Sequence, residues 1–191
     1  MSESTTRGGM HYGLSTNQKL YTVGEGEAEK VEQLFKTATL AIHINELNDI
    51  NPILAATRVF CETAILLESE QEFMDKQIEN IVTETLVFTL LNFPGKKNLL
   101  KNLHNDAKAE THQARTKFPW WPISPLYGAA IVAEEAGELL QACNNHYWDQ
   151  KGGGMEAIYK ELVQLVAMCI RFYTESIVRG EYESSNDSGH H

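Results

Sequence analysis

Apolar residues recur along most of this chain at intervals of three and four positions, and its five prolines stand at a few junctions. Such spacing places apolar side chains along one stripe of an α-helix, whereas a half-buried strand would alternate apolar and polar residues. In the segment 27–47, for example, one stripe collects Val31, Leu34, Phe35, Ala38 and Ile42. The chain is therefore predicted to be all-α and to fold as a helical bundle.

Start and stop signals divide this pattern into successive helices. Asn51 is expected to cap a helix that begins at Pro52, because a proline at the first helical position forfeits no hydrogen bond. Another helix stops at Pro94 and Gly95, and "KGGG" at 151–154 is expected to be a loop. Helices are predicted over residues 27–47, 52–68, 72–93, 96–118, 128–146 and 155–178.

A boundary near Pro94 is predicted to divide the chain into two parts. Residues 23–94 would form a helical region of unknown role, and residues 95–180 would form a second helical domain. Residues 1–22 and 181–191 are polar and lack periodicity, so they are expected to be loose tails.

Composition narrows the class of protein. The chain has 191 residues, of which 42 % are apolar, and can bury a substantial core. No apolar run approaches the roughly 20 residues of a membrane span, and the first residues lack the order of a signal peptide, so a cytoplasmic protein without membrane contact is expected. A formal net charge of −10 argues against a nonspecific nucleic-acid binder, and it implies that any bound phosphate arrives with a cation.

The stretch "IVAEEAGELL" holds three glutamates among apolar residues. On a helix, Glu134 and Glu138 lie about 40° apart and Glu135 and Glu138 about 60° apart, so the three carboxylates share one face. Their mutual repulsion calls for water, basic partners or a hard divalent cation. This motif alone is compatible both with a solvated acidic face and with a metal site.

A second motif lies in the last predicted helix, in "MEAIYKELVQLVAMCIRF". Glu161 and Gln164 are one turn apart there among apolar residues, where an unpaired carboxylate is costly. Antiparallel packing of the two helices around the short glycine loop would bring Glu161 opposite the three glutamates. Glu135, Glu138 and Glu161 are then predicted to offer oxygen ligands to Mg²⁺ or Mn²⁺.

A resemblance to a known family rests on "VAEEAGELLQA" and, after a gap, "ELVQLVAMCIRF". Together they resemble the MazG-like all-α nucleoside triphosphate pyrophosphohydrolases, whose signature is EExxE and then ExxD. The segment "HQARTKFPWWPISPLYGAA" is similar to the entry segment of phage-type members. The resemblance implies that residues 95–180 form a MazG-like domain. It implies a bundle of two or four chains and Mg²⁺ on the motif carboxylates. It also implies hydrolysis of a (deoxy)nucleoside triphosphate between its α and β phosphates, in nucleotide-pool control or housecleaning.

The resemblance also implies roles for the motif residues. The metal ligands would be Glu135, Glu138, Glu161 and Gln164. The catalytic residues would be Glu138 and Glu134, of which Glu134 would orient or deprotonate the attacking water. An exposed glutamate without a role is the alternative for Glu134. Gln164 stands where the family usually has Asp, and its amide brings an oxygen without a charge.

The negative charge that develops on the departing pyrophosphate is expected to be stabilised by positively charged side chains held in place by the fold. Arg171 is the best candidate, because it follows Gln164 by two turns on nearly the same face of the helix. Lys117 and Arg115 are further candidates, although basic residues near a helix end often only favour the helix dipole. Lys160 is expected to point elsewhere.

The connector "PWWPISPLYG" supplies aromatic candidates for contact with the substrate base. Trp120, Trp121 and Tyr127 could stack on it, as flat apolar rings with a polar tip do. Packing at the helix junction is the alternative for either tryptophan.

Two other functions stay open. A phosphoribosyl-ATP pyrophosphohydrolase is related in fold and motif and differs in substrate. A helical binding or regulatory module would keep a nucleotide or a metal ion without turnover, and the neutral side chain of Gln164 favours this alternative.

The very apolar last helix needs more cover than its two neighbours can offer. Either a second chain packs on it, or the stretch from Val31 to Phe93 folds back within one chain. A homo-oligomer, a dimer or a tetramer, is predicted because residues 77–91 offer a broad apolar arc. This arc consists of Ile78, Ile81, Val82, Leu86 and Val87.

Overall fold

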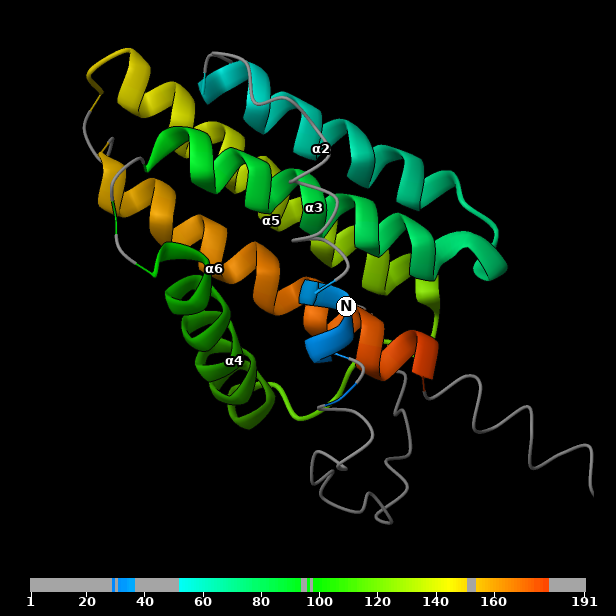
Figure 1. The fold of residues 1–191 in the computed structure, drawn as a ribbon. Coiled ribbons are helices and arrows are strands. Elements are labelled where there is room, and N and C mark those ends of the chain that lie inside the picture. The colour runs from blue at the N-terminus through cyan, green and yellow to red at the C-terminus, as the bar shows by residue number, and fades with distance from the viewer. Residues whose placement is uncertain are drawn as a thin grey trace, which may run out of the picture.

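The computed structural model describes Glu29 and residues 31–36, 52–93, 96, 98–150 and 154–178. These residues form helices and no strand (Figure 1), which confirms the predicted all-α fold. The elements in chain order are α2 (Pro52–Glu68), the 3-10 turn η1 (Gln71–Phe73), α3 (Met74–Asn92), α4 (Leu99–Lys117), α5 (Pro125–Tyr147), α6 (Met155–Phe172) and the π-helical segment η2 (Tyr173–Val178).

Prolines mark the beginning of two helices. α2 begins at Pro52, as predicted. α5 begins at Pro125 instead of the predicted residue 128, and Ser124 is its N-cap. Proline fits the first helical position because its φ is already helical and because that position needs no N–H donor. The predicted start of this helix was therefore wrong. The helix begins three residues earlier, at Pro125, within the aromatic connector.

The last helix changes its hydrogen-bond pattern near its end. The helix predicted over residues 155–178 is observed as α6 followed by η2, whose backbone is π-helical. At this change the Thr174 hydroxyl donates to the carbonyl oxygens of Ile170 (2.8 Å) and Arg171 (3.3 Å). Such a side-chain donor competes with backbone N–H groups, and π-helical turns are frequent at functional sites.

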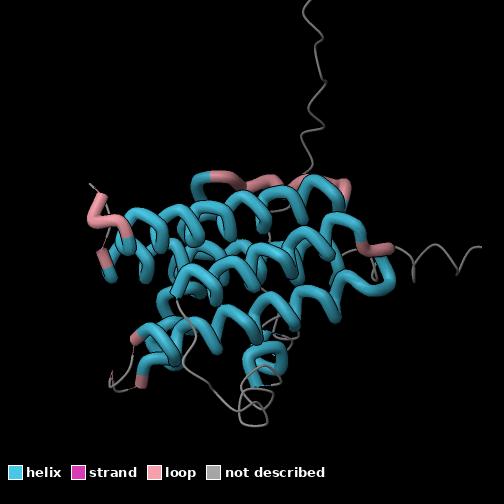
Figure 2. The backbone as a smooth tube through the Cα atoms, turned by 90° about the horizontal axis from the view of Figure 1, so that it is seen from above, coloured by secondary structure: helices cyan, strands magenta, loops and turns pink. Residues whose placement is uncertain are grey.

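The helices α2, α3, α5 and α6 lie side by side in the bundle, and α4 is inclined against them (Figures 1 and 2). α5 packs between α2 and α6, α3 packs on α2, and α4 packs mainly on α6. α6 therefore has α3, α4 and α5 as neighbours. This arrangement covers the apolar last helix with helices of the same chain.

One hydrophobic core joins helices from both sides of Pro94. Ile78 and Phe88 of α3 are fully buried in the same core as Leu162 and Phe172 of α6. Burying such a side chain stabilises a fold by about 1.5–3 kcal/mol relative to leaving it exposed. In the described part of the chain, the helices before and after Pro94 in the sequence thus belong to one bundle, and the helices before it help to cover the last one.

The apolar arc of residues 77–91 faces inward. Its members are all buried within the single chain, namely Ile78, Ile81, Val82, Leu86 and Val87. Of the two possible sources of cover for α6, the described residues show the internal one. The arc consequently gives no reason to expect a partner chain. The oligomeric state itself stays a prediction, which light scattering of the purified chain would test.

The helix predicted over residues 27–47 is described only in part. Val31, Leu34 and Phe35 are buried, and the Phe35 ring stacks on His104 with centroids 4.2 Å apart. The predictions outside the described residues include those on Ala38, Ile42, Asn51, Pro94 and Gly95, the tails 1–22 and 181–191, and residues 151–153 of the glycine loop.

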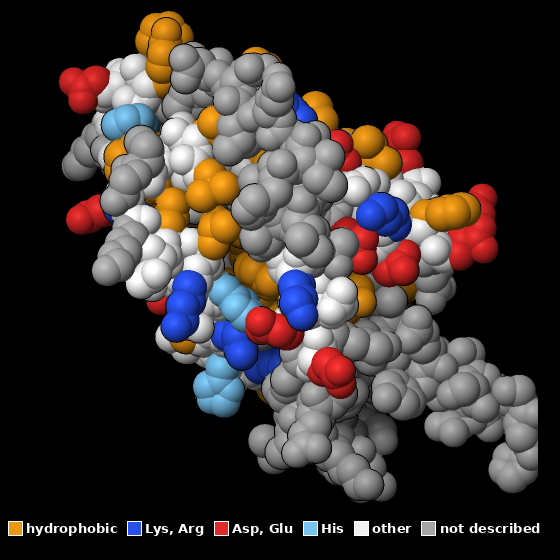
Figure 3. All heavy atoms as spheres, viewed as in Figure 1, with side chains coloured by type: hydrophobic (Ala, Val, Ile, Leu, Met, Phe, Trp, Pro, Cys, Tyr) orange, Lys and Arg blue, Asp and Glu red, His pale blue; other side chains and the backbone are white. Residues whose placement is uncertain are grey.

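The surface carries charges of both signs. On the face seen in Figure 3, acidic and basic side chains are interspersed, and several of the Lys and Arg side chains lie over α4. Over the ranges that the structure describes, every helix falls short of the length or the apolar character that crossing a bilayer requires.

Candidate metal centre and adjoining pocket

Two helices bring three carboxylates together. α5 contributes Glu135 and Glu138, α6 contributes Glu161, and one oxygen of each lies within 4.8 Å of the others. The spacing of three residues within α5 places the first two on one face, and the packing of α5 on α6 adds the third. Glu138 is exposed, whereas Glu135 and Glu161 are half-buried. The carboxylate cluster, defined as these three residues, is thus open to solvent on one side.

Oxygen atoms at this cluster are buried without a hydrogen-bond donor. They are Glu135 Oε2, Glu161 Oε2 and Gln164 Oε1. A buried acceptor without a partner costs about 1–3 kcal/mol, so a purely structural cluster would be expected to come with donors. Mg²⁺ and Mn²⁺ prefer carboxylate and amide oxygens of this kind. The donor set therefore fits a hard divalent cation, with Gln164 adding a neutral oxygen.

The negative charge of the cluster affects the protonation of Glu135. Burial and, after it, the neighbouring charges of Glu138, Glu161 and Glu134 together raise the pKa of Glu135 to about 7. A proton and a divalent cation would therefore compete for this carboxylate near neutral pH. Glu134 itself is exposed and lies outside the cluster, so its contribution here is a negative charge beside Glu135.

Lys160 contacts the cluster, although its side chain is expected from the sequence to point elsewhere. Its ammonium donates to Glu161 Oε1 at 3.0 Å. The hydrogen bond with Glu161 is the largest cause of a raised pKa of Lys160, and the charges of Glu138 and Glu135 add to it. The expectation was wrong because attraction by three nearby carboxylates decides the orientation of this flexible side chain.

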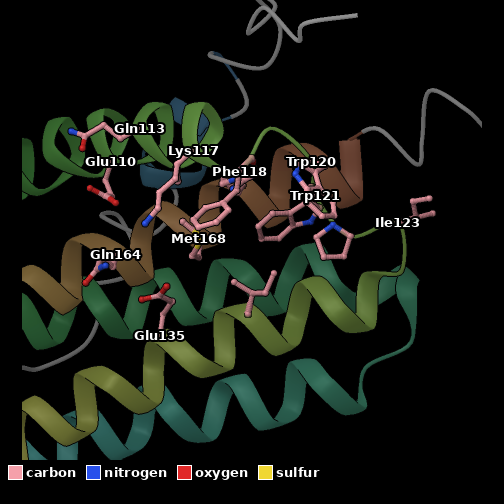
Figure 4. Close-up of a pocket in the computed structure, with 14 residues that line it drawn as sticks. Glu110, Gln113, Lys117, Phe118, Trp120, Trp121, Ile123, Glu135, Gln164 and Met168 are labelled. Atoms are coloured by element: carbon pink, nitrogen blue, oxygen red, sulfur yellow. Dashed lines mark hydrogen bonds between the residues drawn. The ribbon is translucent and has the colours of Figure 1, made fainter. Parts of the chain in front are cut away.

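A pocket of about 820 Å³ adjoins the cluster. Glu135 and Gln164 line it at one end, and Trp120 and Trp121 of the connector line it at the other (Figure 4). Lys117 extends from α4 toward the end with Glu135 and Gln164 (Figure 4). The remaining lining is largely apolar and includes Phe118, Pro122, Ile123, Ile131 and Met168. The pocket therefore has an oxygen-rich end and an aromatic end.

Of the predicted aromatic residues, the structure brings two into the pocket. Trp120 is exposed at its rim, and Trp121 is half-buried in its wall. Tyr127 is 67 % exposed and does not line the pocket. The difference follows from the early start of α5, because Tyr127 belongs to its first turn, where its side chain projects outward.

The two predicted arginines are held by a carboxylate that sequence reasoning missed. Arg171 is buried and lines the pocket, yet its Nε donates to Glu175 Oε1 at 2.9 Å. Arg115 does not line the pocket and donates from Nε to the same oxygen at 2.9 Å. The signal for Glu175 was present, because Arg171 and Glu175 stand four residues apart on one helix face.

Two further residues of the pocket come from α4, and sequence reasoning assigned neither of them. Glu110 and Gln113 line the pocket beside Lys117, and Figure 4 shows all three extending from the same helix. Their spacing of three and four positions places them on one face of α4. Nothing in the sequence indicated which neighbour this face of α4 would meet.

The chain matches no protein-family model, and no curated protein or solved structure matches it. Support for a function therefore comes from the geometry of the site and from the resemblance of its two motifs.

Proposed function

We propose that this chain is a MazG-like nucleoside triphosphate pyrophosphohydrolase that requires Mg²⁺ or Mn²⁺. Water attacks the α phosphorus of a (deoxy)nucleoside triphosphate, the bond to the bridging oxygen breaks, and a monophosphate and pyrophosphate leave. Nucleotide-pool control or housecleaning is the role that such a reaction serves. The observation that carries the proposal is the set of buried, unpartnered oxygens of Glu135, Glu161 and Gln164. Glu135 and Gln164 line one end of an aromatic-walled pocket, and Glu161 lies beside Glu135 in the carboxylate cluster.

At the oxygen-rich end, the chain would hold the cation through Glu135, Glu138 and Glu161, with Gln164 as a neutral ligand. A divalent cation supplies neutralisation of phosphate charge and a more acidic bound water. Without it, a triphosphate would be repelled by the clustered carboxylates. Glu134 is exposed beside the cluster, where its carboxylate can accept a proton from the attacking water.

At the aromatic end, the pocket suits a nucleoside. Stacking of a base on a tryptophan contributes about 1–3 kcal/mol, and Trp120 and Trp121 offer two such rings. A pocket of about 820 Å³ lies within the range of about 300–1,000 Å³ that is usual for small-molecule sites. Lys117 extends toward the oxygen-rich end, where its ammonium can donate to a phosphate oxygen.

Incubation with each (deoxy)nucleoside triphosphate and Mg²⁺ or Mn²⁺, followed by separation of products, tests this proposal. We expect pyrophosphate and a monophosphate from at least one substrate, and no turnover with a chelator. Orthophosphate as the primary product would refute the proposal, as would turnover that a chelator leaves undiminished. Adding phosphoribosyl-ATP to the panel identifies the related pyrophosphohydrolase if only that compound is cleaved.

A second candidate is a binding or regulatory module without turnover. The observation that favours it is Gln164, whose buried oxygen brings no charge where the family motif usually has Asp. Calorimetric binding of a nucleotide with Mg²⁺, in a chain that releases neither pyrophosphate nor orthophosphate, would favour this second candidate.

A further inference from the structure

At the aromatic end of the pocket, two arginines converge on one carboxylate. Glu175 of η2 accepts hydrogen bonds at Oε1 from Nε of Arg171 and Nε of Arg115, each at 2.9 Å. Its Oε2 accepts from Nη2 of Arg171 at 3.3 Å. The side chains of Arg171 and Glu175 are only 3 % and 15 % exposed. Charge-assisted hydrogen bonds of this kind are the stronger ones in proteins, and burial limits their screening.

Arg171 also contacts the connector that forms the aromatic wall. Its Nη2 donates to the carbonyl oxygen of Phe118 at 3.1 Å. Its guanidinium lies over the Trp121 ring, 4.6 Å from the ring centroid. The indole N–H of Trp121 donates to Ser176 Oγ at 2.7 Å. The connector is thus tied to α6 and η2 by two hydrogen bonds and one stacking contact.

These contacts leave Arg171 poorly suited to bind phosphate. Glu175 neutralises its charge, the hydrogen bonds engage its Nε and Nη2, and one face of its guanidinium lies over Trp121. Recruiting it for a phosphate would require breaking a buried ion pair, which is costly because it strands a charge. The geometry instead suits a support for the wall.

We propose that Glu175 is a positioning residue, which orients Arg171 so that Arg171 holds Trp121 and the Phe118 carbonyl in place as the wall of the pocket. Arg171 is then a part of this support and not a ligand of the substrate phosphates. The identity of the ligand that uses the wall rests on the proposed function. The support itself depends only on contacts within the chain.

The first arm of the test needs no ligand. Exchange of the indole N–H of Trp121 with solvent is followed in ¹⁵N spectra, with the exposed Trp120 and Trp148 as internal references. Glu175→Gln should accelerate exchange at Trp121 by about tenfold or more, the scale of losing one hydrogen bond to a charged group. Glu175→Asp keeps the charge and shortens the side chain, so it should fold and give a smaller acceleration. Glu156→Gln is the matched control, an exposed glutamate in the first turn of α6.

The second arm separates the wall from the phosphates. Two probes are titrated with Mg²⁺ present, an α,β-methylene deoxynucleoside triphosphate and inorganic triphosphate, which lacks a base. Glu175→Gln should weaken binding of the nucleotide analogue by about tenfold, consistent with the loss of one stacking contact. It should not weaken binding of inorganic triphosphate or of Mg²⁺ alone, because neither probe stacks on the wall.

Each outcome decides a separate point. Unchanged indole exchange in both Glu175→Gln and Glu175→Asp would overturn the positioning role. An equal loss for both probes would show that the effect of Glu175 does not act through the wall that stacks on the base, which also overturns it. If the unsubstituted chain binds neither probe, the proposed function fails, and the exchange of the Trp121 indole still decides whether Glu175 supports the wall.

Discussion

The oxygen-rich end and the aromatic end of the pocket differ in how their charged groups are compensated. At the oxygen-rich end, oxygens of Glu135, Glu161 and Gln164 are buried without donors. At the aromatic end, Arg115 and Arg171 share the carboxylate of Glu175. Both ends concentrate charge. The second end neutralises it with buried groups of the chain, whereas at the first end the exposed Lys160 pairs with Glu161 Oε1 and leaves these other oxygens without a donor.

This difference indicates which end requires a ligand. A buried polar group without a partner costs free energy in the free protein, and a bound cation would recover it. In a buried ion pair with good geometry, each charged group already has its partner, so no bound ligand is required. Charge alone would have marked the arginines as the binding groups, whereas their pairing identifies them as part of the structure.

The largest expected effect is on the rate of pyrophosphate release, when one carboxylate is removed from the oxygen-rich end. Glu138→Gln or Glu161→Gln should lower the rate of pyrophosphate release by about a hundredfold or more, the scale of removing one electrostatic contact from a transition state. Helical circular dichroism and the unfolding midpoint in chelator should be preserved, because removing a carboxylate relieves repulsion. Glu156→Gln is the matched control, with unchanged rates. A loss of helicity together with activity would mean that the carboxylates are structural.

The next effect comes from crowding the aromatic end. A Cβ at Gly128 would lie 2.9 Å from Phe172 Cδ2 and 3.0 Å from Trp121 Nε1. Overpacking costs about 1–3 kcal/mol, against a helix-propensity gain of up to about 1 kcal/mol from Gly to Ala. Gly128→Ala should therefore lower the free energy of unfolding in a urea titration.

Gly137→Ala is the matched control for Gly128→Ala, because its Cβ would meet only Phe60 Cε2 at 3.7 Å. That distance is an ordinary contact, so this variant should be neutral or more stable by up to about 1 kcal/mol. Equal stability of the two variants would show that the close approach at Gly128 is unimportant.

A smaller effect is expected from adding charge to the oxygen-rich end. Gln164→Asp should tighten Mg²⁺ binding by about tenfold, or about 1.4 kcal/mol, because an added carboxylate raises the charge of a hard-cation site. Calorimetry and the Mg²⁺ concentration required for turnover both measure this change. Gln113→Asp adds the same charge on α4, and a similar gain there would show that only the overall field of the pocket matters.

The smallest effect concerns pH in the absence of metal. The pKa of Glu135 is raised to about 7, so the folded chain binds a proton that the unfolded chain has already released above its ordinary value of 4.5. This contribution to stability is present below that ordinary value and is lost as the pH rises through about 7. Thermal unfolding in chelator should show the decline, and Glu135→Gln should remove it. If Glu135→Gln shows the same decline in stability, the decline is caused by the titration of other groups.

Local patterns in the sequence predicted the helices because hydrophobic periodicity and proline act within a few residues. The error at the start of α5 has the same origin, since Pro125 was read as part of a connector although proline favours the first helical position. Of the carboxylate cluster, the relation between Glu135 and Glu138 follows from helical geometry alone.

What the sequence by itself determined was therefore the set of helices and which side chains share a face of each one. The tertiary structure decided which faces meet. It placed Glu161 beside Glu135 and Glu138 through the register of α5 on α6, and it covered α6 with helices of the same chain. It also decided which partner each charged side chain takes, with Glu175 holding Arg171 and Glu161 holding Lys160. Spacing along one helix limits which groups are within reach, but partner choice depends on distances and burial that arise only when the helices pack.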